Sequence, residues 1–481
     1  MATTYKTPGV YVEEISKLPP SVAQVETAIP AFIGYTEKAK EIVDDDLHLV
    51  PWRITTLLEY ETYFGKAESE TEIEITITDD VDASGNILSL SAIADFNAGN
   101  KSKHNLYYAM QMFFGNGGGP CYIISVDTYS DTVFAQTYNA TALQNGLNVL
   151  ATVDEPTMII FPEGQFVDSS GNYYTLQNNS LAQCDSLKDR VAIIDVYDNS
   201  SATTTVNMTN FRNGIGANNL KYGAVYYPNI VTTLLYQYDE ANVTINHTRT
   251  VNGGAAAAGP FDALALNAAT LAGTVHYAKC TQAIGKLKLV MPPSSAAAGI
   301  YATVDSSRGV WKAPANVSLN YVKDVADLIT NDENAGMNVD VTAGKSVNAI
   351  RAFTGKGILV WGARTLAGND NEWRYVPVRR FFNMVEESCK KSTEPFVFEP
   401  NDANTWVKIQ GMIENFLTTL WRQGALQGAK PEHAFYVAVG LGKTMTSLDI
   451  LEGRLIVEIG MAAVRPAEFI ILRFSHKLAE S

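Results

Sequence analysis

The chain has 481 residues, 46% of them hydrophobic and 18% charged, and it carries a formal net charge of −15. That length fits about three average domains, and the acidic balance disfavours nucleic acid as a main partner, because phosphate binding needs clustered Lys and Arg. No run of ~20 apolar residues predicts a membrane span, and the start MATTYKTPGV lacks the apolar region of a signal peptide, so we expect synthesis in the cytoplasm without export by such a peptide.

Charged residues are scarcer than the ~25% usual in soluble proteins. This deficit indicates that part of the surface is covered by other subunits. The four cysteines are far apart in the sequence and form no C-x-x-C pair, which predicts buried, reduced thiols. They are Cys121, Cys184, Cys280 and Cys389.

The first segment, residues 1–28, is predicted to be an extended arm that precedes the first core strand. It alternates apolar and polar residues after Pro8-Gly9, and it then reaches Pro19-Pro20, which keeps the arm from folding back as a helix. An unpaired strand exposes free N–H and C=O groups, so it is a template for pairing with another chain. The apolar positions available for such contacts are Val10, Val12 and Ile15.

Residues 29–104 are predicted to be the first part of a folded domain, with a strand at 29–35 and a short helix at 54–64. Residues 66–105 interrupt this domain and are acidic. Within them, Ile73, Ile75 and Ile77 alternate with polar residues ahead of a Ser84-Gly85-Asn86 turn, which predicts a β-hairpin insertion.

Residues 105–369 are predicted to form an inserted α/β domain. A helix is expected at 106–114, and helical stretches at 181–188 and 208–212 alternate with apolar strands. Strands that alternate with helices indicate βαβ units and a largely parallel sheet. The expected strands are residues 121–126, 157–161, 191–196 and 224–227.

The C-terminal region, residues 370–466, has long helices followed by strands at 434–439 and 455–462. A final strand is expected at 468–475, within a second arm of residues 467–481. A helix that begins after Asp402 has apolar residues at helical spacing and an opposite face that is polar. The apolar face comprises Trp406, Ile409, Ile413, Phe416, Leu417, Leu420 and Trp421, and the polar face comprises Lys408, Glu414, Asn415 and Arg422.

The helix at residues 379–391 is locally basic within an acidic chain, through Arg379-Arg380 and Lys390-Lys391. Two interpretations stay open: a solvated helix face, or an electrostatic contact with another subunit. Both place these cations on the surface of the protein.

The stretch Gly440-Leu441-Gly442-Lys443-Thr444 resembles the end of a phosphate-binding loop, G-x-x-x-x-G-K-[ST]. Val437 replaces the first glycine and only a short segment follows before the next strand, so a glycine turn is the better interpretation. No G-x-S-x-G or H-E-x-x-H motif occurs, the six histidines are scattered, and the Gly117-Gly118-Gly119 run precedes a strand. The sequence therefore predicts no catalytic residue, no cofactor and no metal site.

Five blocks, in order, resemble the sheath proteins of contractile phage tails and of related bacterial contractile injection systems. The resemblance extends from Tyr5 to Phe474, with residues 66–105 and parts of 129–286 as variable insertions. In the third block, Ser295 stands where the family more often has glycine. The blocks are YKTPGVYVEEI, LYYAMQMFFGNGGGPCYIISV, MPPSSAAAGIYATVDSSRGVWKAPAN, GKGILVWGARTLAGNDNEWRYVPVRR and EPNDANTWVKIQGMIENFLTTLWRQGAL.

The resemblance implies a non-enzymatic protein that stacks as hexameric rings into a helical sheath around an inner tube, and that contracts to drive the tube into a target envelope. It implies an inner domain built from the N- and C-terminal regions, with the α/β domain projecting outward. Both arms would pair with strands of neighbouring subunits, the second through Phe469, Ile471 and Arg473. The polar face of the helix after Asp402 would touch the tube in the extended state.

The implied partners are further copies of the chain, the inner tube protein, and baseplate and terminal cap proteins, with neither nucleic acid nor membrane insertion. The implied location is a phage tail or tail-like particle, assembled in the cytoplasm and released by lysis or anchored at a membrane. A competing hypothesis is an α/β enzyme that binds a ligand or nucleotide at the 440–444 turn as a monomer or small closed oligomer. A surface adhesin is disfavoured by the missing signal peptide.

Overall fold

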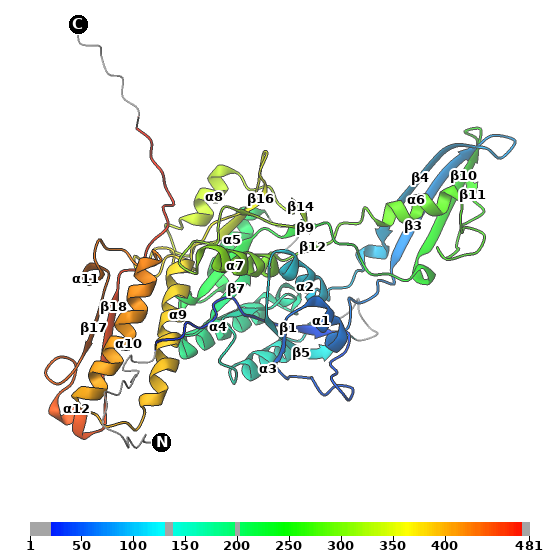
Figure 1. Ribbon diagram of the computed structural model, residues 1–481. Coiled ribbons are helices and arrows are strands. Elements are labelled where there is room, and N and C mark those ends of the chain that lie inside the picture. The colour runs from blue at the N-terminus through cyan, green and yellow to red at the C-terminus, as the bar shows by residue number, and fades with distance from the viewer. Residues whose placement is uncertain (1–20, 130–137, 198–202, 474–481) are drawn as a thin grey trace, which may run out of the picture. The chain divides into compact units, whose positions relative to one another are not determined.

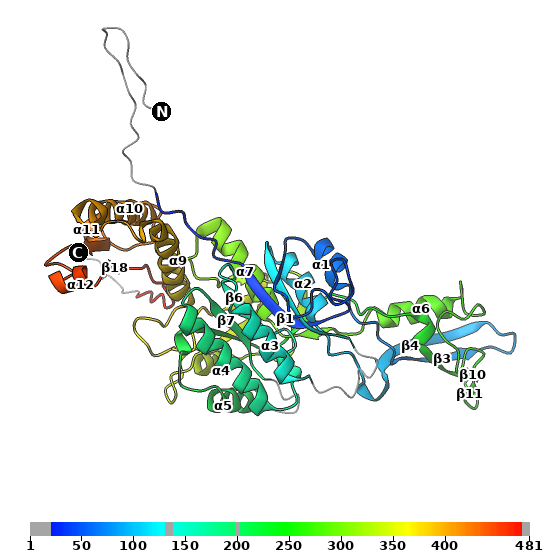
Figure 2. The same ribbon diagram turned by 90° about the horizontal axis from the view of Figure 1, so that it is seen from below.

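The computed structural model describes residues 21–129, 138–197 and 203–473 (Figures 1 and 2). These residues divide into two compact units. The larger, called the α/β unit, comprises residues 26–384 and 465–473, and the smaller, called the C-terminal unit, comprises residues 21–25 and 385–464. The predicted arm residues Val10, Val12, Ile15, Pro19 and Pro20 lie outside the described residues.

The core of the α/β unit is a nine-stranded sheet in the order β13-β16-β15-β8-β7-β6-β1-β5-β2. The neighbouring strands from β15 to β5 run parallel to one another. At the two sides of this parallel set, β16 pairs antiparallel with β15 and β2 pairs antiparallel with β5. The mixed α/β architecture predicted from the sequence is confirmed. The strands are β1 Pro30–Thr36, β2 Trp52–Ile54, β5 Cys121–Thr128, β6 Met158–Ile160, β7 Val191–Asp195, β8 Gly223–Tyr227, β13 Val317–Ser318, β15 Asn348–Phe353 and β16 Gly357–Trp361.

Helices cover both faces of this sheet. On one face α2 packs against α7, and α3, α4 and α5 lie on the other (Figure 2). All seven residues of β1 are buried, because a central parallel strand is covered from both sides. The helices are α1 Leu57–Phe64, α2 Leu106–Gly115, α3 Ala140–Leu150, α4 Ser170–Leu187, α5 Thr204–Gly214, α7 Ser294–Arg308 and α8 Asn331–Asn338.

The structure groups residues 29–104 differently from the sequence expectation, which joined them to the C-terminal region. β1 lies between β5 and β6 and therefore completes the α/β sheet. The boundary between the units falls inside α9, Val376–Thr393, between residues 384 and 385 instead of at 369. Composition and periodicity identify a strand, but they do not identify the strands beside which it pairs.

The predicted hairpin is present, since β3 (Ile73–Val81) and β4 (Ile87–Phe96) pair antiparallel. It forms half of a second sheet, in the order β11-β10-β3-β4, because β10 (Thr244–Val251) pairs parallel with β3. Helix α6, Val275–Ile284, covers the face that carries the isoleucines of β3. The remaining strands of the α/β unit are β11 Ala257–Ala258 and those of a small sheet, β12 Val290–Met291, β9 Ile230–Thr232 and β14 Val322–Val325.

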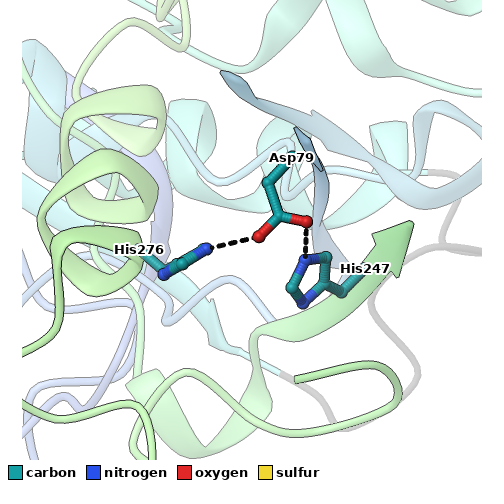
Figure 3. A group of neighbouring side chains, drawn as sticks. All are labelled: Asp79, His247 and His276. Carbon is teal, nitrogen blue, oxygen red and sulfur yellow. Dashed lines mark hydrogen bonds and ion pairs between the residues drawn. The ribbon is translucent and has the colours of Figure 1, made fainter. Parts of the chain in front are cut away.

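Two histidines that are far apart in the sequence meet one carboxylate in this second sheet. Asp79 of β3, His247 of β10 and His276 of α6 are all buried (Figure 3). Nε2 of His276 lies 2.9 Å from Oδ2 of Asp79, Nε2 of His247 lies 3.1 Å from Oδ1, and Arg249 pairs with the same carboxylate at 2.5 Å. These histidines are scattered in the sequence, but the β3–β10 pairing and helix α6 bring two of them to one carboxylate.

The protonation state of Asp79 follows from these contacts. Burial raises the pKa of Asp79, but the contacts with Arg249, His276 and His247 outweigh burial and hold the pKa well below the ordinary value. The carboxylate is therefore ionised throughout the physiological range.

The arginines of α9 are not surface cations: Arg379 is 2% exposed and Arg380 is 4% exposed. Arg380 forms a two-point ion pair with Asp305, at 2.9 and 2.5 Å, and donates to the carbonyl oxygen of Thr27 at 2.7 Å. The guanidinium of Arg379 stacks on Trp373, 4.1 Å from the ring centre. Both interpretations of this pair from the sequence are wrong, because its partners belong to the same chain.

The lysines of the same helix remain on the surface. The ammonium groups of Lys390 and Lys391 pair with Glu387 at 3.2 and 3.3 Å. A solvated face and a contact with another subunit both stay open for these two residues.

All four cysteines are buried with free thiols, as predicted. Among the residues that the structure describes, no helix combines the length and the apolar composition needed to cross a membrane.

We expect His104 to make the stability of the α/β unit depend on pH. His104 is buried, with Nδ1 2.9 Å from the hydroxyl of Tyr138, and burial lowers its pKa to about 4. The unfolded chain binds this proton near pH 6.5 and the folded chain does not, so the contribution of His104 to stability is full above about pH 6.5 and falls by about 3 kcal/mol as the pH drops to about 4.

The measurement is urea unfolding of the wild type and of His104→Gln at several pH values. Burial raises the pKa of Glu70 to about 7, of Glu163 to about 8 and of Asp195 to about 7, which gives these carboxyl groups the opposite pH dependence. They are present in both proteins, so the difference between the two curves isolates His104. Parallel curves would contradict the prediction.

Candidate functional site

The C-terminal unit is built on a two-stranded antiparallel sheet that one long helix covers. Helix α10, Ala403–Arg422, starts at Asp402, whose side chain accepts from the backbone N–H groups of Asn404 and Thr405. Its apolar face packs against β17 (Phe435–Val439), which pairs with β18 (Val457–Met461). The buried residues of the helix include Ile409, Ile413, Phe416, Leu417 and Leu420, as predicted, whereas Trp406 and Trp421 are half-buried. Two short helices complete the unit, α11 Pro431–Ala434 and α12 Ser447–Leu451.

Both long edges of the β17–β18 sheet are open. Within the described ranges, no strand other than β18 pairs with β17, and none other than β17 pairs with β18. The outward N–H and C=O groups of such edge strands are templates for adding a strand from another chain. Cross-strand contact holds the pair in register, because the ring of Tyr436 lies over Gly460, where a Cβ would be 2.1 Å from the ring.

The end of the described chain presents a run of exposed apolar side chains. Residues 469–473 are not a strand, which differs from the prediction for 468–475, because a strand needs a partner and none of the described residues pairs with them. Ile471 and Arg473 are exposed, as are their neighbours. The exposed fractions of the apolar residues are 68% for Phe469, 79% for Ile470, 76% for Ile471 and 73% for Leu472.

This exposed run starts at a fixed point on the α/β unit. The carboxylate of Glu468 accepts from Arg364 at 2.6 Å and from Asn338 at 2.6 Å, with the hydroxyl of Tyr375 at 3.2 Å. The side chain of Arg364 is only 4% exposed. Burial raises the pKa of Glu468, but the hydrogen bonds from Arg364 and Asn338 outweigh it and lower the pKa. We call Arg364, Asn338 and Tyr375 the Glu468 socket.

We expect Glu468→Gln to release residues 465–473 from the α/β unit. The variant keeps the shape of the side chain but leaves the buried Arg364 without its charge partner, which costs about 1–3 kcal/mol. Hydrogen exchange of the peptide that covers these residues should become faster. The matched control is Glu452→Gln, which breaks a 2.6 Å ion pair with an Arg454 side chain that is 63% exposed, and it should leave that peptide unchanged. Equal exchange in Glu468→Gln and the wild type would contradict the prediction.

The polar face of α10 is where the sequence placed it. Lys408, Asn415 and Arg422 are exposed at seven-residue spacing and form one stripe along the helix. Glu414 is half-buried and accepts from Gln410 at 2.7 Å. This face is therefore available to a partner.

The glycine turn at residues 440–444 cannot cradle a phosphate as it stands. Backbone N–H groups of residues 443, 444 and 445 donate to the carbonyl of Gly440 at 3.1–3.2 Å, and that of Gly442 donates to Met445 at 2.9 Å. The hydroxyl of Thr444 donates to the carbonyl of Ile456 at 2.7 Å. The donors that a phosphate loop needs are thus already used within the turn.

We therefore expect ATP to leave the melting temperature unchanged, both in the wild type and in the variant Lys443→Ala. Lys443 is exposed and its removal exposes no buried partner. The measurement is a thermal-shift titration of both proteins. A saturable shift in the wild type that the variant lacks would contradict this expectation.

The Glu468 socket is not predictable from the sequence. Arg364 and Glu468 are separated by 104 residues, and no local pattern marks either as a partner of the other. A glutamate directly before four apolar residues was the only signal, and it is weak.

Comparisons with known proteins agree on one family. Residues 368–477 match the family described as phage tail sheath C-terminal domain. The helical sheath of the anti-feeding prophage (AFP) in its contracted state is 30% identical, with 98% of this chain and 100% of that chain covered and a TM-score of 0.63. The sheath complex of PVC, an extracellular contractile injection system, in its contracted state is 28% identical over 99% of both chains, with a TM-score of 0.63.

A curated relative matches over a shorter stretch. The tail sheath protein of Vibrio phage KVP40 is 24% identical over 136 residues, which are 28% of this chain and 20% of that protein. The matched stretch therefore spans about a fifth of that relative's length.

Proposed function

The chain belongs to the family of contractile sheath proteins, and from this premise we propose that it polymerises as stacked hexameric rings around an inner tube and contracts to drive the tube into a target envelope. It is a structural subunit of a phage tail or tail-like injection particle. Its family is structural, and the turn that the enzyme hypothesis relies on has its donors occupied. We therefore propose no catalytic function.

One observation carries the proposal: among the described residues there is a two-stranded sheet with two open edges and, elsewhere, an exposed apolar segment without a strand partner. Adding such a segment from one subunit to the sheet of the next satisfies the backbone groups of both. Each of the four apolar side chains from Phe469 to Leu472 contributes about 1.5–3 kcal/mol if it becomes fully buried. A head-to-tail contact of this kind repeats without closing, which yields a helical filament.

We propose that both ends of the chain link neighbouring subunits. Residues 1–28 and 467–481 are the linking arms, with contacts through Val10, Val12 and Ile15 in the first and through Phe469, Ile471 and Arg473 in the second. Pro19 and Pro20 are proposed to restrict the first arm, because proline fixes the backbone φ angle.

The polar stripe of α10 is proposed as the surface that touches the inner tube in the extended state. Lys408, Asn415 and Arg422 offer two cations and an amide on one exposed face, with Glu414 beside them. We therefore propose that the C-terminal unit is the part of the subunit that faces the tube. Further proposed partners are baseplate and terminal cap proteins.

Energy for contraction is proposed to come from the lattice and not from a nucleotide. If the contracted lattice buries more apolar surface, each additional ~100 Å² contributes about 2.5 kcal/mol. This gain is repeated for every subunit.

Negative-stain electron microscopy of the purified chain, with and without its inner tube protein as template, tests the proposal. We compare the full chain with variants that lack residues 1–20 or 469–481. Striated tubes from the full chain, lost on either deletion, are expected. Tubes from all three would contradict the role of the arms, and monomers even with the template would contradict the sheath proposal for this chain.

A further inference from the structure

We propose that Asp79, His247 and His276 form a binding site for one divalent transition-metal ion, with Zn²⁺ as the ion whose preferences fit best. The three side chains come from β3, β10 and α6, so the ion would tie the helix to the two strands (Figure 3). This site lies in the second sheet of the α/β unit and is independent of the arms.

The donor set and its spacing carry the proposal. One ligand atom from each residue lies within 4.8 Å of the others, and all three residues are buried. Two imidazole nitrogens and one carboxylate oxygen are a zinc-type set, and ligands at ~2.0–2.2 Å from a shared ion lie roughly 3–4 Å apart. The cluster therefore needs only small side-chain movements to hold an ion. Mg²⁺ and Ca²⁺ prefer oxygen ligands and fit poorly.

A second observation is the state of His247. Its side chain is 0% exposed, and its Nε2 has no well-formed hydrogen bond, although Oδ1 of Asp79 lies 3.1 Å away. The contact with Asp79 therefore satisfies this buried nitrogen only imperfectly. A metal ion would replace the imperfect contact by a direct bond to the nitrogen.

The surrounding residues hold the imidazole rings in place. The ring of Phe261 stacks on that of His247, with 5.5 Å between centres and 12° between planes, and lies 5.0 Å from that of His276. Gly259 leaves the space that the His247 ring occupies, since a Cβ there would lie 2.5 Å from that ring. The ligands are thus preorganised before an ion arrives.

Two contacts set the affinity. The guanidinium of Arg249 shares the carboxylate of Asp79 and repels a cation, but its side chain is 27% exposed and can turn toward solvent. Coordination through Nε2 also moves the proton of His247 to Nδ1, which now accepts from the N–H of Phe261 at 3.3 Å. Both requirements lower the affinity below that of a dedicated structural zinc site, and removing the charge of Arg249 should raise it.

The test is calorimetric titration of EDTA-treated full chain with ZnCl₂ at neutral pH, with MgCl₂ as the comparison ion. We expect one Zn²⁺ per chain in the wild type and in His433→Gln, a control that removes an exposed histidine. Binding should be lost in His276→Gln and His247→Gln and should become at least fivefold tighter in Arg249→Gln. Absence of zinc binding by the wild type, or binding that His276→Gln leaves unchanged, would overturn the proposal and leave the cluster as a charge network only.

Folding of the variants is checked by circular dichroism. If the histidine variants do not fold, the visible absorption spectrum of the wild type with Co²⁺ tests the site instead. Tetrahedral cobalt with nitrogen ligands absorbs strongly in the visible range. That absorption, displaced by Zn²⁺, supports the site, and its absence overturns it.

Discussion

Ile470→Pro or Ile471→Pro is expected to block polymerisation of the chain while leaving the folded monomer unchanged. Both residues lie in the exposed segment, where the described residues form no backbone–backbone hydrogen bond, so proline disturbs little in the single chain. An added strand instead needs its N–H groups, and proline removes one and introduces a clash. Successive N–H groups point to opposite sides, so at least one of the two variants must lose a bond to the neighbouring sheet.

The measurement is the concentration at which sedimentable tubes form, with the inner tube protein as template. We expect an increase of at least tenfold for the affected variant, which corresponds to about 1.4 kcal/mol per contact. Ile471→Val is the matched control, because it keeps the N–H group and a β-branched side chain. If both proline variants form tubes as readily as this control, the segment does not act through strand pairing.

Arg380→Met is expected to lower the free energy of unfolding of the α/β unit by about 3–5 kcal/mol, because it leaves the carboxylate of Asp305 buried without its cation. The two side chains are 3% and 6% exposed and their closest atoms are 2.5 Å apart. Thr27 also donates to Asp305 at 2.6 Å, so the cluster connects the segment before β1 with α7 and α9. Urea unfolding followed by circular dichroism measures the change.

Arg454→Met is the control for this experiment. Arg454 pairs with Glu452 at 2.6 Å, but its side chain is 63% exposed, so the loss is expected to be within about 1 kcal/mol. The double variant Asp305→Leu with Arg380→Met should regain most of the stability, since it removes both buried charges. A loss below about 1 kcal/mol in Arg380→Met alone would show that solvent reaches the carboxylate after the substitution.

Local patterns were sufficient to predict the elements whose partners are close in sequence. The apolar spacing from Trp406 to Trp421 predicted α10, and the alternation at Ile73, Ile75 and Ile77 predicted β3 and its hairpin. A helix that buries one face repeats its apolar residues about every 3.6 positions, and a strand repeats them every two positions. Both repeats can therefore be recognised within a short stretch of sequence.

These local patterns did not predict contacts between segments that are far apart in the sequence. Arg379 and Arg380 read as surface cations because a helix pattern does not reveal that Trp373 and Asp305 cover them. For the same reason the histidines looked unconnected, although β3 and β10 bring His247 beside Asp79.

The proposed linking surface was likewise predictable only in part. The alternating apolar residues of the arms and the polar face of α10 can be recognised in the amino-acid sequence. The open edges of the β17–β18 sheet and the socket that holds Glu468 cannot, because both depend on which strands stay unpaired and which charges are buried after folding. Periodicity records which side of an element faces the interior, whereas pairing between distant residues is settled by the free energy of the whole packed fold.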